Sequence, residues 1–113
     1  MKLVTAFIKP HKLNEVTLAL HDIVGLSGAS VSDVRGFGRG RAREAPDRIL
    51  FDTLEYLPRL RLEIACRDDI VDRVVSVIEA NAHTGLRGDG KIYIAELAQA
   101  VRVSTGERGE TAV

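Results

Sequence analysis

The sequence predicts a single α+β domain in which two helices cover one face of an antiparallel sheet. Three observations lead to this prediction: segments with the two-residue alternation of strands, segments with helical spacing, and the order in which they occur. A chain of 113 residues suits one domain, covering residues 1–113. Apolar residues make up 45% of it, which is enough for a packed core.

The first strand and the first helix follow directly from the N-terminus. Residues 3–9 are rich in Val, Ile and Phe and end at Pro10, as strands often do. Both faces of this strand are mostly apolar, so we expect both to be covered. Residues 12–24 have apolar side chains at helical spacing, and we expect Gly25 and Gly28 to end that helix.

A long connection separates the next two strands. Residues 29–39 are predicted to form the second strand, and residues 59–64 alternate strictly between polar and apolar, which predicts the third. The connection at residues 40–57 is longer than most loops in compact domains, and loops of that kind usually carry function. A disordered insertion is the alternative interpretation.

The second half of the chain repeats the alternation of helix and strand. Asp68 or Asp69 is expected to cap a helix. Its buried stripe consists of Val71, Val74, Val75 and Ile78. Residues 83–90 form a glycine-rich loop, and residues 91–95 are predicted to be the fourth strand.

The last segment is shorter and more polar. Residues 100–103 are predicted to form a short fifth strand, and residues 104–113 a mobile tail unless a partner orders it. The order β-α-β-β-α-β is that of the ferredoxin-like fold. Because both helices lie on one face of such a sheet, we expect another copy of the chain to cover the other face.

Composition excludes several classes of function. The 16 basic and 16 acidic residues balance, which argues against a general nucleic-acid or membrane-surface binder. The arginines near the long loop have few aromatic neighbours that could stack on bases, so we expect no nucleic-acid partner. The single cysteine, Cys66, is expected in the core. No signal peptide, long apolar run or spaced set of metal ligands is evident, so we expect a cytoplasmic protein without a metal site.

The loop at residues 84–91 is the most informative stretch for chemistry. Its glycines allow a close backbone approach, and Arg87 and Lys91 can supply positive charge to an anion. Part of the P-loop pattern is present, but Ile92 stands where Ser or Thr should hold magnesium. The loop also leads from a helix into a strand, the reverse of a P-loop. An anion-binding loop and a tight turn with solvated charges both remain open.

Five short motifs together resemble one known family. They are residues 8–13, 36–39 (Gly-Phe-Gly-Arg), 57–59 (Leu-Pro-Arg), 84–92 (Thr-Gly followed by Gly-Asp-Gly-Lys-Ile) and 100–107 (Ala-Val-Arg followed by Thr-Gly-Glu). In this order and spacing they look like the PII signal-transduction family, the nitrogen-regulatory P-II proteins. The resemblance covers nearly the whole chain.

The resemblance implies a ferredoxin-like homotrimer with ATP, ADP or AMP in the clefts between subunits. It also implies that the long loop is the family's T-loop, which contacts a protein partner such as a membrane transporter. The nucleotide-binding residues that we expect from it are Gly36, Phe37, Gly38, Arg39, Ile64, Thr84, Gly85, Arg87, Gly88, Asp89, Gly90, Lys91 and Arg102. Those expected in the partner-binding loop are Arg41, Arg43, Arg48 and Asp52.

Four departures from the family pattern change the expected function. Gly40 replaces a glutamine that helps to hold magnesium and 2-oxoglutarate, and Arg59 replaces a lysine. Asp52 stands where many members carry a uridylylated tyrosine, and Ser104 replaces a second arginine. We therefore expect a regulator, not an enzyme, that retains adenine-nucleotide binding and has lost 2-oxoglutarate sensing and uridylylation. A ferredoxin-like trimer that senses a small metabolite or metal without nucleotide is the alternative, and a weak nucleotide hydrolase is a third.

Overall fold

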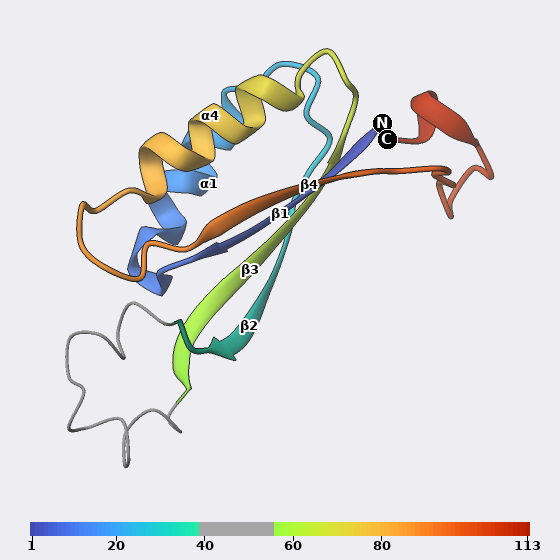
Figure 1. Ribbon diagram of the computed structural model, residues 1–113. Coiled ribbons are helices and arrows are strands. Elements are labelled where there is room, and N and C mark those ends of the chain that lie inside the picture. The colour runs from blue at the N-terminus through green and yellow to red at the C-terminus, as the bar shows by residue number, and fades with distance from the viewer. Residues whose placement is uncertain (39–55) are drawn as a thin grey trace.

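The computed structural model describes residues 1–38 and 56–113. Over those ranges the chain forms four strands, two α-helices and two short 3-10 helices (Figure 1). In chain order they are β1 (Lys2–Ile8), η1 (Pro10–Lys12), α1 (Leu13–His21), β2 (Ser30–Gly36), β3 (Leu57–Cys66), α4 (Val71–Ala82), β4 (Lys91–Glu96) and η3 (Gly109–Ala112). No helix of the described residues is long and apolar enough to cross a membrane.

The four strands form one antiparallel sheet in the order β2-β3-β1-β4. The register pairs Val4 of β1 with Ile64 of β3 on one side and with Ile94 of β4 on the other. Both helices lie on the same face of the sheet, as Figure 1 shows. The ferredoxin-like α+β prediction is therefore confirmed.

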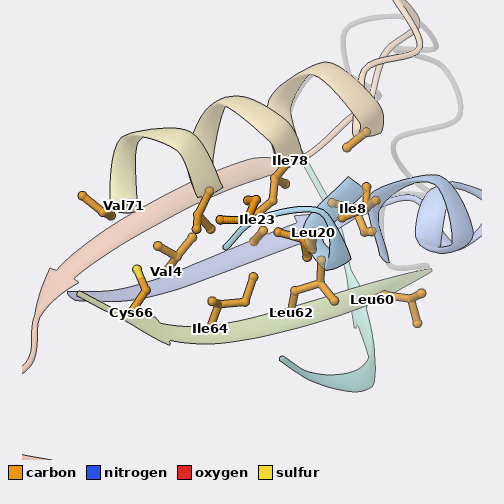
Figure 2. Packing of buried hydrophobic residues seen from close by; sticks show 14 residues of the cluster. Val4, Ile8, Leu20, Ile23, Leu60, Leu62, Ile64, Cys66, Val71 and Ile78 are labelled. Atoms are coloured by element: carbon orange, nitrogen blue, oxygen red, sulfur yellow. The ribbon is translucent and has the colours of Figure 1, made fainter. Parts of the chain in front are cut away.

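The hydrophobic core lies between this sheet face and the two helices (Figure 2). Alternate residues of β1 and β3 point into it, because successive side chains of a strand face opposite sides. Val4, Ile64, Val16, Val74 and Ile78 are fully buried. Cys66 also lies in the core, as predicted, and burial raises the pKa of its thiol.

The other face of the sheet carries a mixture of apolar and polar side chains. On β1 this face holds Leu3, Thr5 and Phe7, which are all partly exposed. The ring of Phe7 meets that of Tyr93 on β4 edge to face, with centroids 6.2 Å apart. Tyr93 is 54% exposed, so the chain leaves this aromatic pair only partly covered.

The first helix is shorter than the sequence predicts. It ends at His21, before Gly25, and Gly25 alone of the two predicted stop residues has a positive φ, of 92°. The chain leaves the helix through tighter turns, in which Ile23 N–H donates to the carbonyl of Leu20. This turn carries Ile23 into the core, which explains why its apolar spacing continued the helical pattern.

The predicted aspartate cap of the second helix is wrong. The N-cap residue is Ile70, and no side chain caps the helix there. Asp68 instead accepts a hydrogen bond from the Met1 amino group at 2.9 Å, and Lys2 Nζ lies 3.2 Å from the same oxygen. Both cations lower the pKa of Asp68, and the Met1 amino group has the larger effect.

The predicted fifth strand is also wrong. Residues 100–103 do not join the sheet; Val101 instead forms an isolated antiparallel bridge with Arg108. The local chain therefore turns back on itself and forms a small hairpin that leads into η3.

Candidate functional site

One end of the sheet gathers most of the residues that the sequence singled out. The antiparallel order places the ends of β1 and β2 beside the starts of β3 and β4. The register fixes this arrangement by pairing Gly36 with Leu57, Ile8 with Leu60, and Phe7 with Lys91. The loop at residues 83–90, between α4 and β4, closes the same end (Figure 1).

Asp89 organises this loop from within. Its carboxylate accepts hydrogen bonds from the Thr84 N–H at 2.8 Å and from the Gly85 N–H at 3.1 Å, and also from the Thr84 hydroxyl. His83 Nδ1 lies 3.4 Å from the same carboxylate. The Thr84 contacts, followed by those of Lys9 and Gly85, hold the pKa of Asp89 well below its usual range. Asp89 is therefore a fixed anion that shapes the loop.

Lys9 connects the loop to the end of β1. Its ammonium lies 3.1 Å from the Asp89 carboxylate and donates to the Thr84 hydroxyl at 3.1 Å. The side chain is 14% exposed, so this ion pair is partly shielded from solvent. The Thr84 hydroxyl also accepts a hydrogen bond from the Leu86 N–H. These contacts give the loop a defined shape before any ligand arrives.

Gly88 brings the loop backbone against a second cation. Its φ is 83°, a left-handed conformation that favours glycine. A Cβ added there would lie 2.8 Å from Arg59 Nη2. A second contact holds the guanidinium in place: its Nη1 donates a hydrogen bond to the Pro58 carbonyl at 2.7 Å. The glycine turn and the Arg59 cation therefore occupy the same small region.

Gly90 is required by packing within the chain itself. Its φ is 108°, and a Cβ there would lie 1.7 Å from the Phe7 carbonyl oxygen. The loop therefore enters β4 in direct contact with the β1 backbone. Only a residue without a side chain allows this approach.

Gly36 and Gly38 differ from these loop glycines. A Cβ added at either position would meet no atom of the described chain within 4 Å, and neither has a positive φ. Between them, Phe37 packs edge to face against Tyr56, with ring centroids 5.3 Å apart. This contact brings the residue directly after β2 against the residue directly before β3. No contact among residues 1–38 and 56–113 therefore requires glycine at these two positions.

Arg102 lies away from this group, beyond the far end of β4. The loop precedes Lys91 and Arg102 follows Glu96, so the whole strand separates them (Figure 1). A strand of that length spans roughly 20 Å. A single chain therefore does not bring Arg102 to the glycine loop.

The remaining predicted residues have different positions. Ile64 lies in the centre of β3 with its side chain fully buried, so that side chain does not line the surface. Lys91 begins β4, and both Arg87 and Lys91 are exposed. Arg39, Arg41, Arg43, Arg48 and Asp52 lie outside the described residues.

Two residues of this region were not among the predicted site residues. Lys9 belongs to one of the five motifs, but its role depends on Thr84 and Asp89, which are about 80 residues away in the chain. In the sequence, Arg59 stands out only as a replacement for lysine. Their motifs, residues 8–13 and 57–59, are the only signal in the sequence that could have pointed to these two cations. Local spacing cannot indicate which loop a cation will contact.

The fold and this end of the sheet define a class of protein. It is a ferredoxin-like α+β domain with a preorganised, cation-flanked glycine loop between its second α-helix and its last strand. Comparison with known proteins identifies the family: a profile of nitrogen regulatory protein P-II matches residues 1–107. The chain belongs to the P-II family of signalling regulators.

Full-length relatives support this assignment. The chain is 42% identical to nitrogen regulatory protein GlnK of Escherichia coli K12, over all 113 residues and the full length of both proteins. It is 40% identical to nitrogen regulatory protein P-II of Azospirillum brasilense and 41% identical to that of Rhodospirillum rubrum, again over 113 residues and the full length of each chain.

Proposed function

We propose that this protein binds an adenine nucleotide, ATP, ADP or AMP, between the subunits of a homotrimer and regulates a partner protein through residues 40–57. The observation that carries the proposal is the contact of the Gly88 turn with the Arg59 guanidinium. Exposed backbone at a left-handed glycine and an adjacent cation are the features that recognise phosphate oxygens. Lys91 begins the next strand and adds a further positive charge to those of Lys9 and Arg59.

The open space at Gly36 and Gly38 supports the same proposal. No contact among the described residues requires glycine there, and the missing side chains permit a ligand or a neighbouring chain to approach the backbone closely. This backbone lies at the same end of the sheet as the Gly88 turn.

The position of Arg102 supports a site shared between subunits. Arg102 lies about one strand length from the glycine loop, so a single phosphate chain cannot contact both within one protomer. A second copy, packed on the partly exposed sheet face, could supply its own Arg102. Homotrimer formation is thus part of the proposed site.

Calorimetry with ATP, ADP, AMP and adenosine tests the proposal, with and without Mg²⁺ and 2-oxoglutarate. We expect binding of at least one phosphate-bearing nucleotide and no added effect of 2-oxoglutarate, since Gly40 lacks the side chain that would hold it. Absence of binding by every nucleotide would refute the proposal and favour a metabolite or metal regulator instead.

A substitution at Lys91 tests its contact with phosphate. Lys91→Ala is expected to weaken nucleotide binding by about 1–3 kcal/mol, the range for removing one partner of a hydrogen bond and leaving the other unpaired. Lys12→Ala is the matched control, because Lys12 pairs with Glu15 at the start of α1. Equal affinities of the two variants would remove Lys91 from the site.

Removal of residues 40–52, replaced by a short glycine-serine linker, tests the partner-binding role. We expect nucleotide affinity to stay within about twofold, while a protein partner captured by the full-length chain is no longer retained. Capture of the same partner by the shortened protein would place the docking surface elsewhere.

A further inference from the structure

The C-terminal hairpin is held together through Arg102. The Arg102 N–H donates to the Glu107 carbonyl at 2.9 Å, and the Gly106 N–H donates back to the Arg102 carbonyl at 2.8 Å. The Gly109 N–H donates to the Ala100 carbonyl at 2.9 Å and extends the hairpin. The backbone therefore holds residues 102 and 107 side by side.

The Arg102 guanidinium is also engaged by its own hairpin. Nη1 lies 3.7 Å from the Glu107 carboxylate, and Nη2 donates to the Thr111 carbonyl at 3.2 Å. Glu107 is fixed in turn, because the Thr105 hydroxyl donates to its carboxylate at 3.0 Å. Arg102 and Glu107 are 44% and 42% exposed, so an incoming anion can reach this pair.

We propose that Glu107 stays paired with Arg102 when nucleotide phosphates bind at this site, and that its negative charge weakens their binding. This inference rests on the proposed function. Other N–H donors of the guanidinium stay available, so a phosphate can bind without displacing Glu107. It then shares one cation with a carboxylate, and the two anions repel each other. Glu107 thus sets how strongly the site responds to the charge of its ligand.

The expected size of the effect is moderate because the pair is exposed. Exposed ion pairs contribute up to about 1 kcal/mol, which corresponds to roughly fivefold in affinity. The repulsion also extends to the other phosphates within a Debye length of about 10 Å at 0.1 M salt. The effect should therefore grow with ligand charge and shrink at high salt.

Calorimetry on the full chain with Glu107→Gln tests this inference. The amide keeps the size and an acceptor oxygen for Thr105 while it removes the charge. Glu110→Gln is the matched control, since it removes the same charge from the same tail and lies outside the Arg102 contacts described above. We expect Glu107→Gln to tighten ATP binding three- to fivefold at 0.05 M salt, AMP binding less, and adenosine binding not at all.

The outcomes separate this inference from the proposed function. Tighter ATP binding by Glu107→Gln than by Glu110→Gln, with a difference that disappears at 0.5 M salt, supports it. Unchanged or weaker ATP binding by Glu107→Gln, in a wild-type chain that does bind ATP, overturns it and leaves Glu107 as a support for Arg102. If neither wild type nor Glu107→Gln binds any nucleotide, the proposed function fails and this inference fails with it.

Discussion

At the scale of single residues, the glycine loop depends on two positions with different functions. Gly90 makes room for the backbone of β1, whereas Asp89 holds the loop through hydrogen bonds to Thr84 and Gly85. One is needed for the fold and the other for the shape of the loop. The two positions can be tested separately.

Gly90→Ala is expected to destabilise the protein strongly. The new Cβ would clash with the Phe7 carbonyl, and the residue would keep a positive φ of 108°. The loss should exceed the roughly 1–2 kcal/mol that a left-handed conformation alone costs. The free energy of unfolding, measured in urea, checks this. Gly28→Ala is the control, because a Cβ there meets nothing within 4 Å and the change should stay within about 1 kcal/mol.

Asp89 should make stability depend on pH on the acid side. Its pKa is lowered in the folded state, so its stabilisation is present above the unfolded pKa of about 4. That stabilisation is lost as pH falls from there through the folded pKa. Unfolding free energies of wild type and Asp89→Asn between pH 3 and pH 6 should therefore converge as pH falls.

The comparison with Asp89→Asn is needed because Asp68 titrates in the same direction. The pKa of Asp68 is lowered by the Met1 amino group and Lys2 at the other end of the sheet. Asp68 remains in both proteins, so its effect cancels in the difference. A gap between wild type and Asp89→Asn that is independent of pH would contradict the assigned role of Asp89.

At the scale of secondary-structure elements, α4 contributes to stability through one apolar stripe. Val71, Val74, Ile78 and Ala82 are its buried residues, and they face the sheet as Figure 2 shows for Val71 and Ile78. The helix also leads directly into the glycine loop. Its packing therefore fixes where the loop begins.

Ile78→Ala should lower the free energy of unfolding by about 2–5 kcal/mol, because it leaves a cavity in a fully buried position. Urea or thermal unfolding measures this. Leu18→Ala on α1 is the control, since Leu18 is 69% exposed and should change stability by less than about 0.5 kcal/mol. Similar losses for both variants would show that the two helices do not pack as described.

At the scale of the whole molecule, the sheet face opposite the helices is only partly covered within a single chain. Phe7 and Tyr93 form an aromatic pair there that stays partly exposed. Burial of such aromatic surface between subunits is a common source of oligomer stability. The proposed nucleotide site depends on the same association.

Light scattering after size exclusion should give about three times the chain mass of 12.3 kDa. Tyr93→Glu should reduce this mass and abolish nucleotide binding, because a carboxylate buried at an interface is costly. Leu18→Glu introduces the same charge on an exposed apolar residue of the helical side and should leave the mass unchanged. An unchanged mass for Tyr93→Glu would mean that another surface joins the subunits.

Much of the fold could be predicted because its signals are local. The strict alternation at residues 59–64 lies within β3, which also extends to Leu57 and Cys66. The spacing of Val71, Val74 and Ile78 corresponds to α4. Side-chain periodicity reflects the geometry of the element itself, so no distant contact is needed to recognise it.

The errors have two sources: contacts with parts of the chain that are distant in the sequence, and a local turn that replaces a strand. Asp68 looked like a helix cap but binds the Met1 amino group, 67 residues away. Ile23 continued the helical pattern because it returns to the core, not because the helix continues. Residues 100–103 have strand composition, but Val101 pairs with the nearby Arg108 in a local hairpin and not with the sheet.

By itself, the sequence determined the order of the elements, the buried stripes and the motifs of the P-II family, because these depend on neighbours along the chain. Only the tertiary structure decided that Lys9 and Arg59 meet the glycine loop, that Gly90 must accommodate Phe7, and that Arg102 lies beyond the other end of β4. The reason is physical: strand pairing brings together residues that are far apart in sequence, and such contacts leave no periodic trace in either partner.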